Sequence, residues 1–129
     1  MDKIPKEDLI YQDDDLAVIL DADYAVKGHL LVIWKKHANN LSDLSEEEYL
    51  RFSKIVHKTE KALLKNLKLD KSIILKSGGL VSHFHFHIYP VRSNIAWDEV
   101  KKIFEKKVRY NYKEGEKSEL VKHFKNIFN

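Results

Sequence analysis

Three histidines alternate with two phenylalanines over residues 83–87, and this spacing is the strongest chemical signal in the chain. Side chains at every second position of a β-strand point to one face, so a strand here would carry a row of imidazoles. Phe84 and Phe86 would then point to the opposite face, into a core. Neutral imidazole is a nucleophile, a metal ligand and a proton carrier near neutral pH. This segment is therefore the first candidate for a reactive site.

Three interpretations of the histidine row imply different chemistry. The first is structural, an exposed strand face that happens to hold histidines. The second is a zinc or iron site, because two strand histidines at i and i+2 can bind one ion. Such sites usually add a carboxylate, and no Asp or Glu lies within the segment. The third is direct catalysis, in which one imidazole attacks phosphorus while its neighbours donate protons and hydrogen bonds.

The composition limits the class of protein. A chain of 129 residues can form one domain with a hydrophobic core but not two ordinary domains. Hydrophobic residues make up 43% and charged residues 33%, which is typical of a soluble globular protein. No apolar run approaches the roughly 20 residues of a membrane helix, and the first residues lack the order of a secretory signal. Because cysteine is absent, thiolate metal sites are excluded, and a cytoplasmic location without a membrane partner is expected.

The net charge of +3 is unevenly distributed. Residues 1–23 hold eight acidic and two basic side chains, whereas residues 101–129 hold nine basic and four acidic ones. A basic terminus could attract a phosphate-bearing ligand or a nucleic acid. A solvated helix face with lysines is the more common explanation of such a run, so no nucleic-acid partner is expected.

The remaining pattern predicts the elements that must position the histidines. The clearest helix begins after Ser45, where Glu48 completes a capping box and an apolar stripe follows over about 20 residues. Short apolar runs predict strands near residues 9–11, 16–20, 29–34, 72–76 and 83–90. Two further helices are expected near residues 98–107 and 118–128. The predicted fold class is α+β, a mainly antiparallel five-stranded sheet with one long helix on a face and a C-terminal helical tail.

The histidine segment and its neighbours together resemble the histidine triad (HIT) family. Residues 83–89 match the family signature, in which three histidines alternate with apolar residues and two more apolar residues follow. Residues 11–21, 28–37 and 39–44 are similar to the first hairpin, the following strand and the lead into the long helix. The match runs from about residue 9 to residue 91. Residues 92–129 match no segment that we can name and are expected to be a helical extension of a single domain, 1–129.

The resemblance implies a nucleotide hydrolase or transferase that acts on the α-phosphate and needs no metal or other cofactor. By motif position His85 would attack the α-phosphorus and carry a transient nucleotidyl group. His87 would contact the phosphate and help to protonate the leaving group, while His83 and His29 would complete the hydrogen-bond network. If one ring nitrogen of His85 is held as a donor, the other stays a free nucleophile, and a buried backbone carbonyl could hold it.

The resemblance also suggests how a purine nucleotide would be bound. Asp21 lies eight residues before His29, where the family carries an Asp or Asn that binds both ribose hydroxyls, and a carboxylate can accept two hydrogen bonds. Ile10 and Leu20 could frame the base, although apolar strand residues are usually core. Three residues of the turn before the histidines could bring backbone N–H groups close to a phosphate: Ser77, Gly78 and Gly79.

The chain departs from the family pattern just before the histidines. The family's Gly-Gln-Ser/Thr-Val reads Gly-Gly-Leu-Val at residues 78–81, so both polar side chains are lost and backbone amides are expected to carry more of the phosphate contacts. The third triad position is His87 rather than the glutamine of the transferase branch, which favours hydrolysis. The sequence does not choose between an amine leaving group, as in nucleoside phosphoramidates, and a nucleotide, as in dinucleoside polyphosphates.

Two other classes of function stay open at this point. A nucleotide-binding module with little turnover would keep the pocket but lack the lost polar groups. A His-ligated metalloenzyme would need a carboxylate from elsewhere in the chain. HIT proteins commonly form homodimers through the long helix and a sheet edge, so the resemblance also implies a homodimer.

Overall fold

Five strands form one antiparallel sheet in the order β1-β2-β3-β5-β4. The computed structural model describes residues 5–21, 25–78 and 83–128. The main elements are β1 (Leu9–Gln12), β2 (Leu16–Leu20), β3 (Leu30–Trp34), α1 (Glu46–Leu67), β4 (Lys71–Ser77), β5 (His85–Val91), α2 (Trp97–Phe104) and α3 (Glu116–Phe128). The predicted fold class is confirmed. Within the described ranges, no helix is long and apolar enough to cross a membrane.

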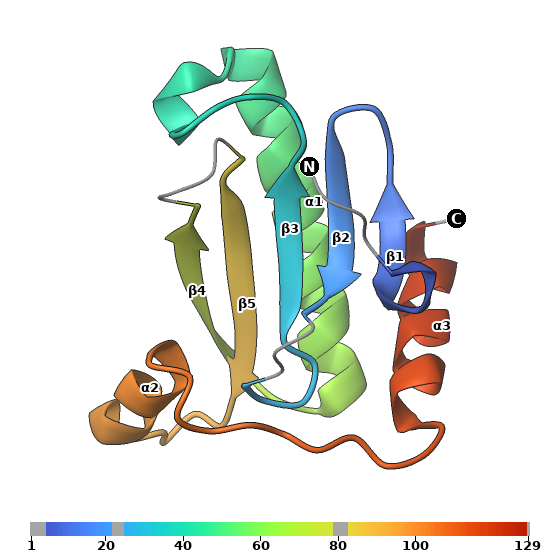
Figure 1. The fold of residues 1–129 in the computed structure, drawn as a ribbon, viewed down its shortest axis with the longest axis vertical. Coiled ribbons are helices and arrows are strands. Elements are labelled where there is room, and N and C mark those ends of the chain that lie inside the picture. Colours follow the sequence, from blue (N-terminus) through green and yellow to red (C-terminus); the bar gives the residue numbers. More distant parts are fainter. Residues whose placement is uncertain (1–4, 22–24, 79–82, 129) are drawn as a thin grey trace.

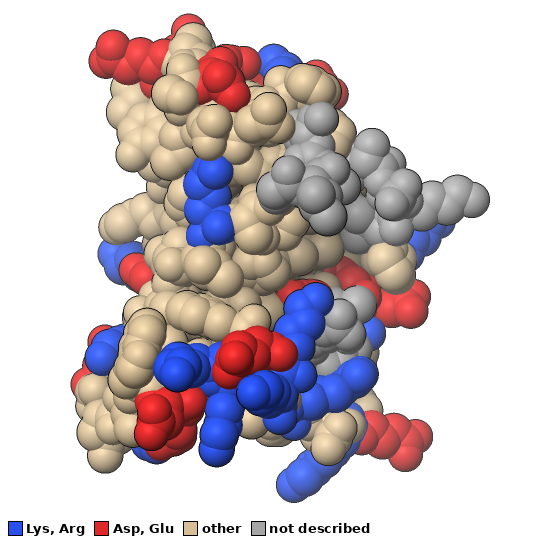
Figure 2. All heavy atoms as spheres, turned by 60° about the vertical axis from the view of Figure 1, so that its left-hand side comes forward, with Lys and Arg blue, Asp and Glu red and all other residues tan. Residues whose placement is uncertain are grey.

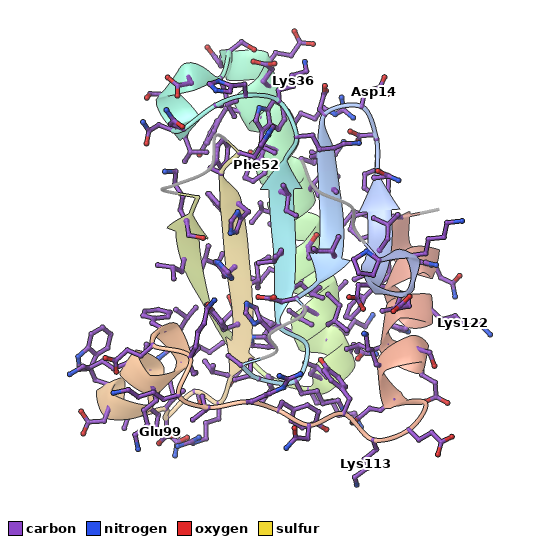
Figure 3. The ribbon with its side chains drawn as sticks, viewed as in Figure 1. Asp14, Lys36, Phe52, Glu99, Lys113 and Lys122 are labelled. Atoms are coloured by element: carbon purple, nitrogen blue, oxygen red, sulfur yellow. The ribbon has the colours of Figure 1, made fainter. Side chains whose placement is uncertain are left out.

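The long helix α1 packs behind the sheet and holds the histidine strand from its rear face (Figure 1). The predicted capping box is present, because Ser45 Oγ accepts from the Glu48 N–H at 3.1 Å and the Glu48 carboxylate accepts from the Ser45 N–H at 2.9 Å. Phe52, labelled in Figure 3, is 1% exposed and lies 5.2 Å and 5.0 Å from the rings of Phe84 and Phe86. The phenylalanines between the histidines therefore anchor this strand to α1.

The histidine strand begins two residues later than the sequence predicts. Strand β5 starts at His85, whereas His83 forms an isolated parallel bridge with Ala38. The β4–β5 ladder ends at the pair Ser77–His85 because the chain turns at Gly78, which has φ +126°. A Cβ added to Gly78 would lie 2.9 Å from the carbonyl oxygen of His83, so only glycine fits this close approach.

The C-terminal residues pack against both ends of the sheet. Helix α3 covers the β1 edge, where Phe128 stacks on Tyr11 at 5.0 Å and Phe124 enters the main core with 1% exposure. Helix α2 packs near the start of β4 and the end of β5 and buries Ile103 against Tyr89 (Figure 1). The sheet is therefore held between α1 behind it, α3 at one edge and α2 near the other.

Candidate active site

The two faces of the sheet carry different kinds of side chain. Leu20, Leu30 and Ile88 are paired across three strands, and each is fully buried in the core beneath α1. Because side chains alternate along a strand, His85 and His87 point to the opposite face. A cavity of about 280 Å³ on that face brings together five residues predicted from the sequence: Asp21, His29, Ser77, His85 and His87.

A hydrogen bond from the backbone sets the tautomer of His29. The N–H of Ala25 donates to His29 Nδ1 at 3.3 Å, so this nitrogen must carry a lone pair and the proton of the neutral ring lies on Nε2. His29 Nε2 lies 3.0 Å from His87 Nδ1 and 3.2 Å from the Asp21 carboxylate. We therefore assign His29 as a donor that is shared between His87 and Asp21.

The direction of hydrogen-bond donation continues from His87 through Ser77 to His85. With its Nδ1 accepting from His29, a neutral His87 carries its proton on Nε2 and donates it to Ser77 Oγ at 2.8 Å. The Ser77 hydroxyl then donates to His85 Nε2, also at 2.8 Å. A backbone contact with His83 raises the pKa of His85, so it favours the protonated ring and points to the His83 carbonyl. Because Ser77 occupies Nε2, we assign this contact to Nδ1 of His85. His85 Nε2 is left as a nucleophilic lone pair.

Burial keeps the two reactive imidazoles neutral. It lowers the pKa of His85 below its ordinary value, against the opposing influence of the Asp21 carboxylate. Burial and repulsion from His29 and His85 lower the pKa of His87 further, to about 4. Neutral imidazole is the form that attacks an electrophile, so this environment suits His85 to act as a nucleophile at neutral pH.

Comparison with known proteins identifies the family. The family model of the HIT domain matches residues 3–94. The chain belongs to the HIT family. An uncharacterized HIT-like protein of Saccharolobus solfataricus is 30% identical over 127 residues, 92% of this chain and 89% of that protein. Adenosine 5′-monophosphoramidase of Saccharomyces cerevisiae is 30% identical over 97 residues, 67% of this chain and 59% of that protein.

A solved structure of the HIT family has the same fold. A HIT-like protein from Bartonella henselae superimposes with a TM-score of 0.68 at 28% identity, and the match covers 96% of this chain and 88% of that one. The match therefore includes most of the C-terminal residues for which the sequence offered no counterpart.

Three further residues of the predicted site, His83, Gly78 and Ser77, have contacts that the sequence did not indicate. No hydrogen bond joins the ring of His83 to another site imidazole, and its Nδ1 is buried without a hydrogen-bond partner among the residues that the structure describes. Gly78 makes room for the backbone at His83, which is sufficient reason for a glycine. The hydroxyl of Ser77 contacts the rings of both His85 and His87, a role that the sequence did not indicate. Gly79 lies outside the described residues.

Ile10 and Leu20, which were expected to frame the base, lie on the core face of the sheet and not on the face that carries His85 and His87. Leu20 is fully buried and Ile10 is 5% exposed, because both point into the core under α1. Their neighbours Leu9 and Ile19 are partly exposed and lie in one cross-strand row with Leu31 and His87. Counting back from Asp21 in steps of two places Ile19 on the same face as the Asp21 carboxylate.

The cluster of Asp21, His29 and His87 has the residue types of a metal site, and its ligand atoms lie within 4.8 Å of one another. A histidine that binds zinc through Nε2 must leave that nitrogen unprotonated and usually donates from Nδ1–H. In His29 the Ala25 N–H faces Nδ1, so the proton occupies the nitrogen that a metal would need. The donor set therefore fits a chain of hydrogen bonds and does not fit an ion.

The low pKa of His87 predicts a loss of stability in mild acid. The pKa is about 4 in the folded chain, against 6.5 for an ordinary histidine, so the unfolded state binds more protons between these pH values. This contribution to the free energy of unfolding is complete above pH 6.5 and is lost as the pH falls toward 4. Urea denaturation at several pH values should show a steeper decline for the wild type than for His87→Gln. Equal slopes would contradict the prediction.

Proposed function

We propose that this HIT protein is a metal-independent hydrolase that cleaves the α-phosphate bond of a purine nucleotide derivative through a nucleotidyl–His85 intermediate. The observation that carries the proposal is the oriented chain from His29 through His87 and Ser77, which leaves a lone pair on His85 Nε2. The monophosphoramidase activity named for the yeast relative is of the same reaction class.

The proposed reaction has two displacements at phosphorus. His85 Nε2 first attacks the α-phosphorus, so that a P–N bond forms and the bond to the leaving group breaks, with the electron pair departing on the leaving group. The Ser77 hydroxyl, which contacts the attacking nitrogen in the free protein, would yield this position to the phosphate and could donate to one of its oxygens. Water then attacks the same phosphorus, breaks the P–N bond, releases the nucleoside monophosphate and restores His85 while its surplus proton leaves to solvent.

The remaining parts of the nucleotide would occupy the rest of the same face. Asp21 lines the cavity with its side chain 16% exposed, so its carboxylate can orient His29 and accept from the ribose hydroxyls. The apolar row of Leu9, Ile19 and Leu31 continues from His87 across the sheet and offers a surface for a purine ring. We propose this row in place of Ile10 and Leu20.

A covalent adduct tests the proposed reaction. Brief incubation with diadenosine tetraphosphate or adenosine 5′-phosphoramidate, an acid-free quench and intact-protein mass spectrometry should reveal one added adenylyl group in the wild type. The adduct should be absent in His85→Ala and unchanged in the matched control His123→Ala, which alters an exposed histidine of α3. Turnover that is lost with a chelator and proceeds without an adduct would contradict the proposal and favour a metalloenzyme.

The same experiment also distinguishes the hydrolase from the alternative function, a nucleotide-binding module with little turnover. In that case the wild type would bind nucleotides but would neither form an adduct nor turn over any of these substrates. The closed chain of hydrogen bonds favours turnover, because a module that only binds nucleotides would not need His85 to be held with a free lone pair.

We also propose that the protein forms a homodimer in the cytoplasm through the free edge of β4. This strand pairs with β5 alone among the described strands, whereas α3 covers the opposite edge at β1. Ile74 is 42% exposed on the α1 side of β4, and unpaired edges with exposed apolar residues favour association. The second copy would extend the sheet and pack against α1.

Light scattering after size exclusion tests the homodimer. The wild type should have twice the mass of the chain, and Ile74→Glu should have the mass of one chain. Val108→Glu is the matched control, because Val108 is similarly exposed at 38% but lies in the segment after α2. A wild type that stays monomeric at micromolar concentration would contradict the proposal.

A further inference from the structure

Part of the wall of the active-site cavity comes from the segment that follows β5. Ile103 and Phe104 of α2, and Lys106 just after this helix, line the cavity together with His85 and His87. All three lie beyond residues 3–94, the region that matches the HIT domain. This part of the cavity wall, which includes a cation, therefore comes from outside the region that the HIT domain model matches.

The position of Lys106 is fixed by the end of α2. Ile103 is 4% exposed in a small core with Tyr89, and the ring of Phe104 lies 5.7 Å from that of Tyr89. The N–H of Lys106 donates to the Ile103 carbonyl at 3.2 Å, and the N–H of the next residue donates to Lys102 at 2.9 Å. These two bonds form a Schellman motif with Lys106 at φ +58°.

The left-handed conformation alone does not indicate a functional role. Lys68 adopts the same conformation after α1, where it is exposed and lies outside the cavity. What distinguishes Lys106 is its place in the wall of the cavity. A glycine would adopt the same φ at lower cost, but it would remove the only lysine that lines the cavity among the described residues.

The charge of Lys106 acts on the imidazoles of the site. It is one of the charges that lower the pKa of His87, and Lys106 lines the same cavity as His85. Residues 101–109 hold five basic side chains and one acidic one. Figure 2 shows basic side chains gathered at one end of the molecule, the end that carries α2 in Figure 1.

Resting on the proposed function, we propose that Lys106 binds the leaving group and that the leaving group is an anionic phosphate chain. The substrate class would then be dinucleoside polyphosphates rather than phosphoramidates of neutral amines. Lys106 would pair with the oxygens of the β-phosphate, on the side of the α-phosphorus opposite to His85 Nε2. A charge-assisted contact of this kind strengthens as the leaving group gains negative charge.

The proton balance of the site supports the same leaving group. An amine must gain a proton when its bond to phosphorus breaks, whereas a phosphate can depart as an anion that keeps the electron pair on the former bridging oxygen. His87 is neutral at pH 7, since burial lowers its pKa to about 4. If His87 gave its Nε2 proton to a leaving amine, the ring would become an imidazole anion unless it received another proton from the neighbouring hydrogen-bonded groups. The resident charge of Lys106 can stabilise a phosphate without any proton transfer.

Two lysine variants distinguish a specific contact between Lys106 and the substrate from the general electrostatic effect of the basic residues 101–109. Lys106→Met removes the charge and keeps an aliphatic side chain, and Lys107→Met does the same at the neighbouring exposed residue, which pairs with Glu105 outside the cavity. The measurement is kcat/KM for diadenosine tetraphosphate and for adenosine 5′-phosphoramidate. Lys106→Met should lower kcat/KM for the tetraphosphate by about ten-fold or more, while the value for the phosphoramidate stays within about three-fold. Lys107→Met should change both equally and by less than about three-fold.

A binding measurement in a variant that cannot react gives an independent readout. In a His85→Ala background, calorimetry should show weaker binding of diadenosine tetraphosphate when Lys106→Met is added, with the affinity for AMP unchanged. Equal losses for both substrates, equal effects of the two lysine variants, or unchanged tetraphosphate binding would overturn the assignment of Lys106. A wild type that hydrolyses the phosphoramidate but not the tetraphosphate would overturn the substrate class alone. If the wild type turned over neither substrate, the proposed function would fail as well.

Discussion

The hydrogen bond from the Ala25 N–H to His29 Nδ1 fixes the direction of every later bond in the site. A backbone N–H can only donate, so the neutral His29 ring must donate from its other nitrogen. Each following group has one donor and one acceptor to offer, and the direction passes unchanged through His87 and Ser77. It ends at a lone pair on His85 Nε2. If any of these imidazoles gained an extra proton, two hydrogen-bond donors would face each other. Burial, which keeps the rings neutral, therefore preserves the lone pair on His85 Nε2.

The sheet places the side chains of the site at the distances that this series of hydrogen bonds requires. Ser77 and His85 are direct partners in the β4–β5 ladder, and Leu31 of β3 is the partner of His87. The reactive strand lies between β3 and β4 and is held from behind by Phe52 of α1. The close turn at Gly78 brings the chain against the His83 carbonyl, which orients the His85 ring. His85 and His87 thus stand on a central strand with Ser77 beside them on the edge strand β4, while α2 and the segment after it complete the cavity.

Local patterns of residues predicted the parts of this protein that depend on local physics. Period-two spacing placed His85 and His87 on one face, and the Ser45–Glu48 pair located the start of α1. Spacing could not predict the role of the Ser77 hydroxyl, because that role depends on a cross-strand partner. The residues expected to frame the base, Ile10 and Leu20, lie on the core face, since apolar residues occupy both faces of β1 and β2 and only the register to Asp21 separates them. The wall formed by Phe104 and Lys106 depends on how α2 docks, which the amphipathic pattern of the helix leaves open.

The tautomers of the three site histidines are the most direct test of the assigned series of hydrogen bonds. Two-dimensional ¹⁵N–¹H NMR of the ring nitrogens at pH 7, assigned by single histidine substitutions, reports which nitrogen of each imidazole carries the proton. The account predicts a proton on Nε2 of His29 and His87 and on Nδ1 of His85. A proton on His85 Nε2, or a charged His87 ring at this pH, would contradict it, because the nucleophile would then have no lone pair to offer or the chain would run in the opposite direction.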